Sequence, residues 1–326
     1  MDDKEEIKRA ILRRFYDGAF KDGIDYQVGL RAYASEKGIG WELINEIYDE
    51  FNDEGFFGTC CTSMAVEPSI KALVYCENQQ LVDQALVEKQ NDIRKRVLEA
   101  CVDIREEKLT PYADGPPGDM ICERANISRQ DFANNAGILV FGDYIEQQYP
   151  MDIWRITEKG RETVKDLRRK RERLKEFEKL KALEKMTRQA RGHRLEDLLA
   201  EAIEDEGWEV EKRVQSKGKE HDIVIHKGSE YFLISCKWEK PAVQGKAVRD
   251  IFAGAQAMVC VAGILVSMSG FTPNCIGQAL EYKTKQQIIL FGPKDVGAIF
   301  SNEAKFSELL KEKIKQLKLM GNILVE

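Results

Sequence analysis

Two short runs of β-forming residues, separated by a turn, constrain this chain more than any other feature. Residues 220–238 read EHDIVIHKGSEYFLISCKW, with a glycine between the two apolar runs. Such a pattern predicts an antiparallel hairpin. The first strand of a hairpin begins beside the end of the second, so we expect Asp222 and Lys237 to meet at one end of a sheet.

The sequence around this hairpin alternates between helical and β-rich patterns. HRLEDLLAEAIEDEGWEV predicts a helix that ends at Gly207, followed by a strand beginning near Trp208. After the hairpin, VQGKAVRDIFAGAQAM predicts a further helix, and VAGILVSMSG and QQIILFG predict two more strands. Residues 192–326 are therefore expected to form one α/β domain, a mixed sheet with helices on both faces.

The first half of the chain predicts two smaller, mainly helical domains. In residues 1–87, three amphipathic helices precede a β-prone stretch, which is the element order of a winged helix. The order returns in residues 88–166, where Ser128 is a plausible N-cap of the third helix. IWRITEKGRETV resembles the end of prokaryotic winged-helix domains, in which a wing strand leads into T-x-x-G and a last helix.

A highly charged helix is predicted between these halves, as a basic linker over residues 167–191. Residues 161–191 contain 13 Lys and Arg against six Asp and Glu, a local excess of seven positive charges. One interpretation is a solvated linker held by ion pairs between successive turns. The other is a helix that also binds DNA phosphates. The DNA-binding candidates are Arg168, Arg169, Lys170 and Arg171.

Composition narrows the class of protein. The 326-residue chain carries a net charge of −6, which argues against coating by nucleic acid but permits a local basic face. No apolar run reaches the roughly 18 residues of a membrane span, and the charged N-terminal segment is unlike a signal peptide. The eight cysteines form no CxxC pair, which disfavours a zinc site and favours a reducing, cytoplasmic location without membrane attachment.

An aspartate and a lysine at one end of a sheet can act together on a phosphate. A carboxylate at residue 222 can bind a hard divalent cation, which prefers oxygen ligands. A neighbouring ammonium can stabilise the charge that grows on a phosphate during hydrolysis. The pair therefore suits phosphodiester hydrolysis, although an Asp and a Lys at strand ends can also be a screened surface ion pair.

Residues from 190 to about 300 resemble the catalytic domain of Mrr-type restriction endonucleases, in the PD-(D/E)xK nuclease superfamily. KEHDIVI matches the strand with the family's Asp, LISCKW the strand with its Lys, and GILVSMSGFTP a later strand and turn. The resemblance implies a DNA endonuclease of restriction or host defence, with Mg2+ or Mn2+ as cofactor. Cleavage of both DNA strands would then argue for a homodimer.

The resemblance also assigns roles to individual residues. Asp222 would be a metal ligand and Lys237 the catalytic lysine. Glu196 matches an acid that supports the metal site, and Gln256 matches a polar position of the catalytic cleft.

Ser235 departs from the family pattern, which has Glu or Gln two residues before the lysine. Serine is short and neutral, so it would reach a metal ion poorly. Glu220 or Glu239 could replace the missing carboxylate, the site could bind metal weakly and cut slowly, or it could have lost its chemistry and kept DNA binding.

Two other classes of function therefore stay open. One is a catalytically impaired nuclease fold that acts as a DNA-binding regulator or assembly factor. The other is an interaction protein, because residues 40–54 are acidic and poorly suited to a DNA groove.

Overall fold

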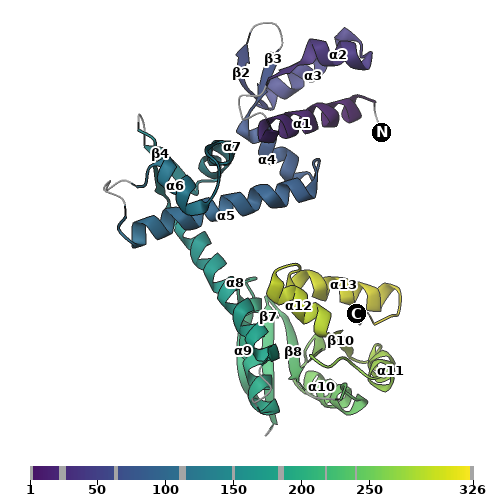
Figure 1. Ribbon diagram of the computed structural model, residues 1–326. Helices are drawn as coiled ribbons and strands as arrows, with labels where there is room; N and C mark the ends of the chain where they lie inside the picture. The colour runs from purple at the N-terminus through teal and green to yellow at the C-terminus, as the bar shows by residue number, and fades with distance from the viewer. Residues whose placement is uncertain are drawn as a thin grey trace. The chain divides into compact units, whose positions relative to one another are not determined.

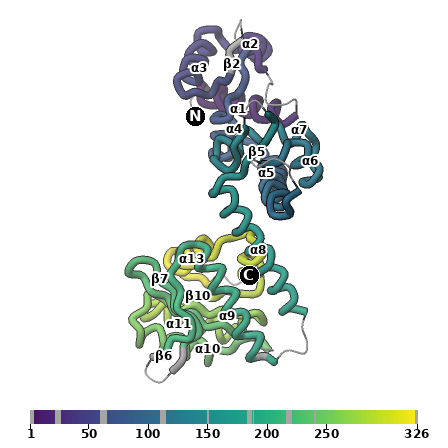
Figure 2. Tube along the Cα trace, turned by 90° about the vertical axis from the view of Figure 1, so that its left-hand side faces the viewer, coloured from purple at the N-terminus to yellow at the C-terminus, as the bar shows by residue number. Residues whose placement is uncertain are grey.

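The computed structural model describes residues 3–21, 27–61, 65–109, 115–148, 151–182, 187–216, 219–238 and 241–323. The chain divides into two compact units, residues 1–166 and 167–326, which are considered separately below (Figures 1 and 2). No helix in these described ranges has both the length and the apolarity needed to span a bilayer.

The first unit is mainly helical. Its elements are α1 (Asp3–Lys21), β1 (Val28–Gly29), α2 (Leu30–Lys37), α3 (Trp41–Asp53), β2 (Phe57–Cys61), β3 (Ala65–Pro68), α4 (Ile70–Asn78), α5 (Gln84–Glu106), α6 (Gly118–Ala125), α7 (Arg129–Phe141), β4 (Ile145–Gln148), β5 (Ile153–Ile156) and the start of α8 (Glu158–Ala182). The same order occurs twice: the antiparallel strands β2 and β3 follow α1–α3, and the antiparallel strands β4 and β5 follow α5–α7. Strand β1, which the sequence pattern did not predict, joins the first of these sheets beside β3.

A buried polar network ties the two halves of the first unit together. The guanidinium of Arg94 on α5 donates to both oxygens of Glu77 on α4, at 2.7 and 2.8 Å, and to Asn135 on α7 at 2.9 Å. The hydroxyl of Tyr16 on α1 donates to the same glutamate at 2.7 Å. Because each charge has well-placed partners, the network can be buried and still hold four helices in register.

The T-x-x-G segment closes the second small sheet. The Thr157 hydroxyl accepts the Gly160 amide at 3.0 Å and so caps the first turn of α8. A Cβ atom at Gly160 would lie 2.3 Å from the Tyr144 carbonyl oxygen, so this close approach of helix and strand requires glycine.

The second unit is built on a mixed sheet, as the sequence predicted. Its elements after α8 are α9 (Arg188–Glu204), β6 (Glu209–Ser216), β7 (Lys219–Lys227), β8 (Glu230–Lys237), α10 (Gly245–Ala257), β9 (Ala262–Ser267), α11 (Pro273–Tyr282), β10 (Gln287–Phe291), α12 (Pro293–Ser301) and α13 (Phe306–Leu319). Within the described residues, five strands lie in the order β10-β9-β8-β7-β6. Strands β6, β7 and β8 are antiparallel, whereas β8, β9 and β10 are parallel.

Helices cover both faces of this sheet, which confirms the predicted restriction-endonuclease-like fold class (Figure 1). One apolar core packs α9, α12 and α13 against one face, around side chains such as Ile223 and Ile234. The other core packs α10 and α11 against the opposite face, around Val224 and Leu233. Adjacent strand residues thus serve different cores, as the two-residue period of a strand requires.

The end of α8 packs into the core of the second unit. Phe177 and Leu180 are 1% and 3% exposed among the core residues of α9 and α12. Glu176 accepts two hydrogen bonds from Arg194 of α9, at 2.7 and 2.6 Å. The part of the predicted linker that contains Phe177 and Leu180 therefore packs against the second unit.

Candidate active site

The candidate site lies where β7 and β8 diverge. Their ladder runs from Lys227 paired with Glu230 to Ile223 paired with Ile234, and its regular register ends there. Beyond it, the Cys236 amide donates to the Asp222 carboxylate at 2.9 Å. A side chain thus accepts a backbone donor at the point of divergence, which fixes the orientation of the carboxylate.

A pocket of about 410 Å³ opens at this point. It is lined by Gln189, Gly192, His193 and Glu196 of α9, Asp222 of β7, and Cys236, Lys237 and Trp238 at the end of β8. The predicted meeting of Asp222 and Lys237 therefore occurs, with Glu196 beside them. Lys237 also lines a second pocket, together with Lys246 of α10.

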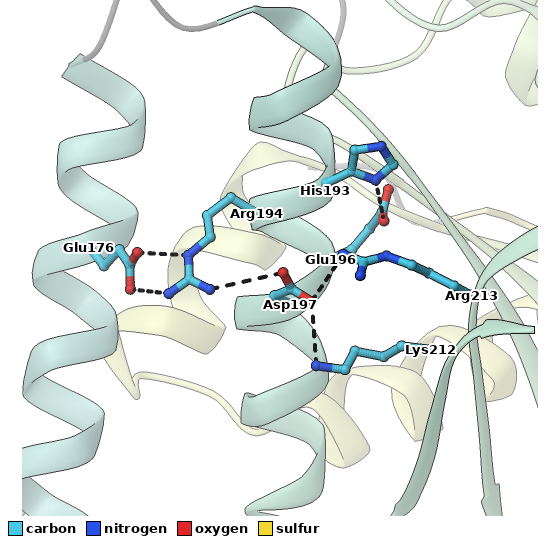
Figure 3. A network of polar contacts seen from close by, with 7 residues as sticks. All are labelled: Glu176, His193, Arg194, Glu196, Asp197, Lys212 and Arg213. Atoms are coloured by element: carbon cyan, nitrogen blue, oxygen red, sulfur yellow. Dashed lines mark hydrogen bonds and ion pairs between the residues drawn. The ribbon is translucent and has the colours of Figure 1, made fainter.

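Glu196 is the more deeply buried acid of the site, at 7% exposure. Burial raises the pKa of its carboxyl, and the nearby charge of Asp222 raises it further. His193, three residues earlier on α9, has its Nδ1 atom 3.1 Å from a Glu196 oxygen and opposes part of this pKa shift (Figure 3). The protein thus keeps two carboxylates near each other in a sheltered place, an unfavourable arrangement unless a cation joins them.

Cys236 and not Ser235 faces this pocket. Cys236 lies on the same side of β8 as Ile234, toward α9, whereas Ser235 takes the opposite side and pairs with Leu265 of β9. Burial raises the pKa of the Cys236 thiol well above its ordinary value, so it stays protonated. The side chain of Glu220 and the whole of Glu239, the two candidates to replace a carboxylate at Ser235, lie outside the described residues.

The donor set fits a hard divalent cation. Asp222 and Glu196 offer carboxylate oxygens, the ligands that magnesium prefers, in a pocket with room for water and a phosphate. Among the described side chains, no group of three His, Cys, Asp or Glu is placed to hold a metal ion. The remaining coordination positions would fall to water and to the substrate, as is common for magnesium.

Gln256 does not join the residues that the structure brings together. Helix α10 connects the parallel strands β8 and β9, so it runs back along the sheet from the Lys237 end. Its last turn therefore lies toward Phe232, which pairs with Ala262, and Gln256 is exposed there. The sequence argument placed this residue on the correct helix but did not account for the direction of that helix.

The four DNA-binding candidates lie on α8. Arg169 pairs at 2.5 Å with Asp205, the C-cap of α9, and Arg173, one turn later, contacts the same carboxylate. Lys170 lines a separate pocket of about 420 Å³ with Arg173 and Asp205. Part of the basic charge of this helix therefore forms ion pairs within the second unit, and DNA binding by Arg168, Arg169, Lys170 and Arg171 stays a prediction.

Sequence reasoning overlooked His193. Its spacing of three residues from Glu196 places both side chains on one face of a helix, and this was the signal that could have identified it.

Comparisons with known proteins agree with this geometry. The family model Mrr_cat, described as a restriction endonuclease, matches residues 187–296, the segment that contains every residue of the pocket. A search of curated proteins found no match.

Three solved structures show weak similarity. The protein of unknown function AF1548 is 15% identical, with a TM-score of 0.27 over 32% of this chain and 63% of its own. The protein VC1899 from Vibrio cholerae is 13% identical, with a TM-score of 0.29 over 66% and 50%. The restriction endonuclease FokI bound to DNA is 11% identical, with a TM-score of 0.30 over 82% and 59%.

The chain spans between 50% and 63% of the length of these three structures. With TM-scores at or below 0.30, these similarities support no conclusion about the fold or function of this protein. The family match and the site geometry together lead to one conclusion. Residues 187–296 match the restriction endonuclease family model, and they lie in the unit whose mixed five-stranded sheet has a restriction-endonuclease-like fold.

Proposed function

We propose that this protein is a DNA endonuclease that hydrolyses phosphodiester bonds with a divalent metal ion in restriction or host defence. The observation that supports this best is the pocket in which Asp222, Glu196 and Lys237 converge, inside the segment that matches the restriction endonuclease family. Magnesium is the proposed ion, with manganese as the second choice. DNA as substrate and six buried, unpaired cysteines among the described residues fit a cytoplasmic location.

In this mechanism, Asp222 and Glu196 would hold the cation. A bound divalent ion supplies charge neutralisation at the phosphate and lowers the pKa of water. The Cys236 amide fixes the direction of the Asp222 carboxylate, and His193 does the same for Glu196. Lys237 lines the same pocket, where its ammonium would stabilise negative charge on the phosphate.

The helical unit would choose or position the duplex. Residues 1–87 and 88–166 each have the element order of a winged helix, a module that places its third helix against DNA. One site cuts one strand, so cleavage of both strands would require a second copy of the chain.

Ser235 favours one alternative, a DNA-binding regulatory or assembly protein whose nuclease site is impaired. Its side chain is too short to act as the family's metal-binding carboxylate or amide, and it lies on the other side of β8 from the pocket-lining Cys236. The two proposals differ in whether DNA is cut.

Cleavage of supercoiled plasmid, methylated and unmethylated, separates them. The wild-type chain should nick DNA with Mg2+ or Mn2+ and stop when EDTA is added. Asp222→Ala and Lys237→Ala should each lose this activity and keep DNA binding. Lys227→Ala and Glu230→Ala are matched controls, because these residues pair at the opposite end of the same hairpin. DNA binding without cleavage by the wild-type chain would support the alternative, and control variants as impaired as the site variants would contradict the assigned roles.

A further inference from the structure

Arg213 has an unusual backbone in the middle of β6. Its φ angle is 56°, in the left-handed region that residues other than glycine rarely adopt. The ladder between β6 and β7 is irregular there, since Lys212 pairs with Ile223 and Val214 pairs with His221. The skipped position is opposite Asp222, so the distortion lies level with the candidate active site. A disfavoured backbone that persists at a site is a reason to ask what it positions.

The distortion turns two adjacent cations to the same side. Neighbouring residues of a regular strand point to opposite faces. Here Lys212 Nζ and Arg213 Nη2 both approach Oδ1 of Asp197 on α9, at 3.3 and 3.5 Å (Figure 3). Arg194 adds a third cation to this carboxylate at 3.9 Å, while Glu176 takes two hydrogen bonds from Arg194.

The cations of this cluster are open to solvent. Lys212 and Arg213 pair with Asp197, and Arg194 pairs with Asp197 and Glu176, while Glu201 adds a further negative charge near Arg194. The side chains of Lys212 and Arg213 are 42% and 50% exposed, whereas that of Asp197 is 23% exposed. Ion pairs this exposed are weak, so an incoming anion can take these cations from Asp197 at little cost.

The cluster lies beside the pocket. Asp197 directly follows Glu196 on α9, and Lys212 and Arg213 reach toward the same helix from β6 (Figure 3). A phosphodiester held at the pocket has neighbouring phosphates along the same strand. The planar donors of an arginine match the oxygens of such a phosphate.

We propose that Lys212 and Arg213 bind a backbone phosphate of the DNA strand next to the bond that is cut, and that Asp197 holds them in place until DNA arrives. The inference rests on the proposed function, since it names how the same site holds its substrate. It gives the left-handed Arg213 a role, because a regular strand would turn one of the two cations away.

The test uses equilibrium binding of a labelled duplex to the full chain in EDTA, measured by fluorescence anisotropy over a series of KCl concentrations. Arg213→Gly removes the guanidinium and keeps a residue that tolerates the left-handed backbone. The slope of log affinity against log salt should fall by about 0.9, the value for one lost phosphate contact, which is roughly a fivefold loss at 0.15 M salt. Asp197→Asn, which removes the competing carboxylate, should bind DNA more tightly than the wild type.

Lys227→Ala controls for the change in net charge and should leave the slope unaltered. Thermal unfolding of each variant reports a purely structural role. If Arg213→Gly and Asp197→Asn lower the melting temperature but leave affinity and slope at wild-type values, the inference is wrong and the proposed function stands. If the wild-type chain does not bind DNA at all, both are wrong.

Discussion

Glu196 is only 7% exposed, and replacing it with glutamine removes the negative charge of its carboxylate. Burial, and then the charge of Asp222, raises the pKa of Glu196, so folding disfavours the charged form of this group. Holding the charged carboxylate in this buried place therefore costs stability. Glutamine has nearly the same shape and carries no charge. We therefore expect Glu196→Gln to be more stable than the wild type when no metal is present.

The expected gain is on the order of 1 kcal/mol, at the lower end of the penalty for a buried polar group that is incompletely compensated. The His193 contact at 3.1 Å already offsets part of that penalty, which is why the lower end applies. For a domain of this size, such a gain corresponds to a rise in melting temperature of about 2–4 °C.

The pH dependence of this difference follows from the sign of the pKa shift. A carboxyl whose pKa is raised in the folded state destabilises the fold above its unfolded pKa, and the penalty is complete above the folded pKa. Below the ordinary value of 4.5, the acid is neutral in both states and the penalty disappears. The advantage of Glu196→Gln should therefore be absent below pH 4.5 and grow as the pH rises above that value.

Thermal unfolding of both chains in EDTA, from pH 4 to 8, measures this advantage. Adding Mn2+ should then make the wild type more stable than Glu196→Gln. The wild type keeps both carboxylates, so it binds the ion more tightly, and a ligand that binds the folded state stabilises it. A Glu196→Gln chain that is less stable than the wild type at pH 7 in EDTA would refute the electrostatic reasoning.

Three further predictions concern stability, each measured by chemical or thermal unfolding. Arg94→Met should cost roughly 3–5 kcal/mol, because Glu77, with a side chain 14% exposed, loses its charged partner; a loss below about 1 kcal/mol would contradict this. Gly160→Ala should cost about 1–3 kcal/mol, because its Cβ would lie 2.3 Å from the Tyr144 carbonyl oxygen; a neutral effect would show that helix and strand can separate freely. Phe177→Ala should cost about 3–5 kcal/mol in the unfolding of the second unit; an unchanged transition would mean that α8 is a spacer after all.

The fold of the second unit was predictable because its signals are local. The apolar runs around HKGSE specify a hairpin, and the hairpin alone brings Asp222 and Lys237 to one end of the sheet. The family pattern then placed Glu196 on the first helix of the domain, where it lines the same pocket.

The directions of individual side chains depend on backbone features that the spacing of residues in the sequence does not specify. The left-handed conformation of Arg213 interrupts the strand period, so the directions of Lys212 and Asp222 could not be counted from the sequence. The position of Gln256 depends on the direction in which α10 returns along the sheet.

The long charged helix was ambiguous for a related reason. Its charge pattern fits either a solvated linker helix or a helix that also binds DNA phosphates, and the burial of Phe177 and Leu180 against α9 adds a packing role that neither interpretation included. Such burial is a tertiary contact, which a thin apolar stripe alone does not specify.

Binding of Mn2+ by the wild-type chain and by Asp222→Asn, followed by electron paramagnetic resonance, tests the central claim most directly. The claim is that a divalent cation binds between Asp222, near the start of β7, and Glu196 of α9. The account predicts that the wild type binds the ion and that Asp222→Asn, still folded, loses that binding. Equal Mn2+ binding by the two chains would contradict it.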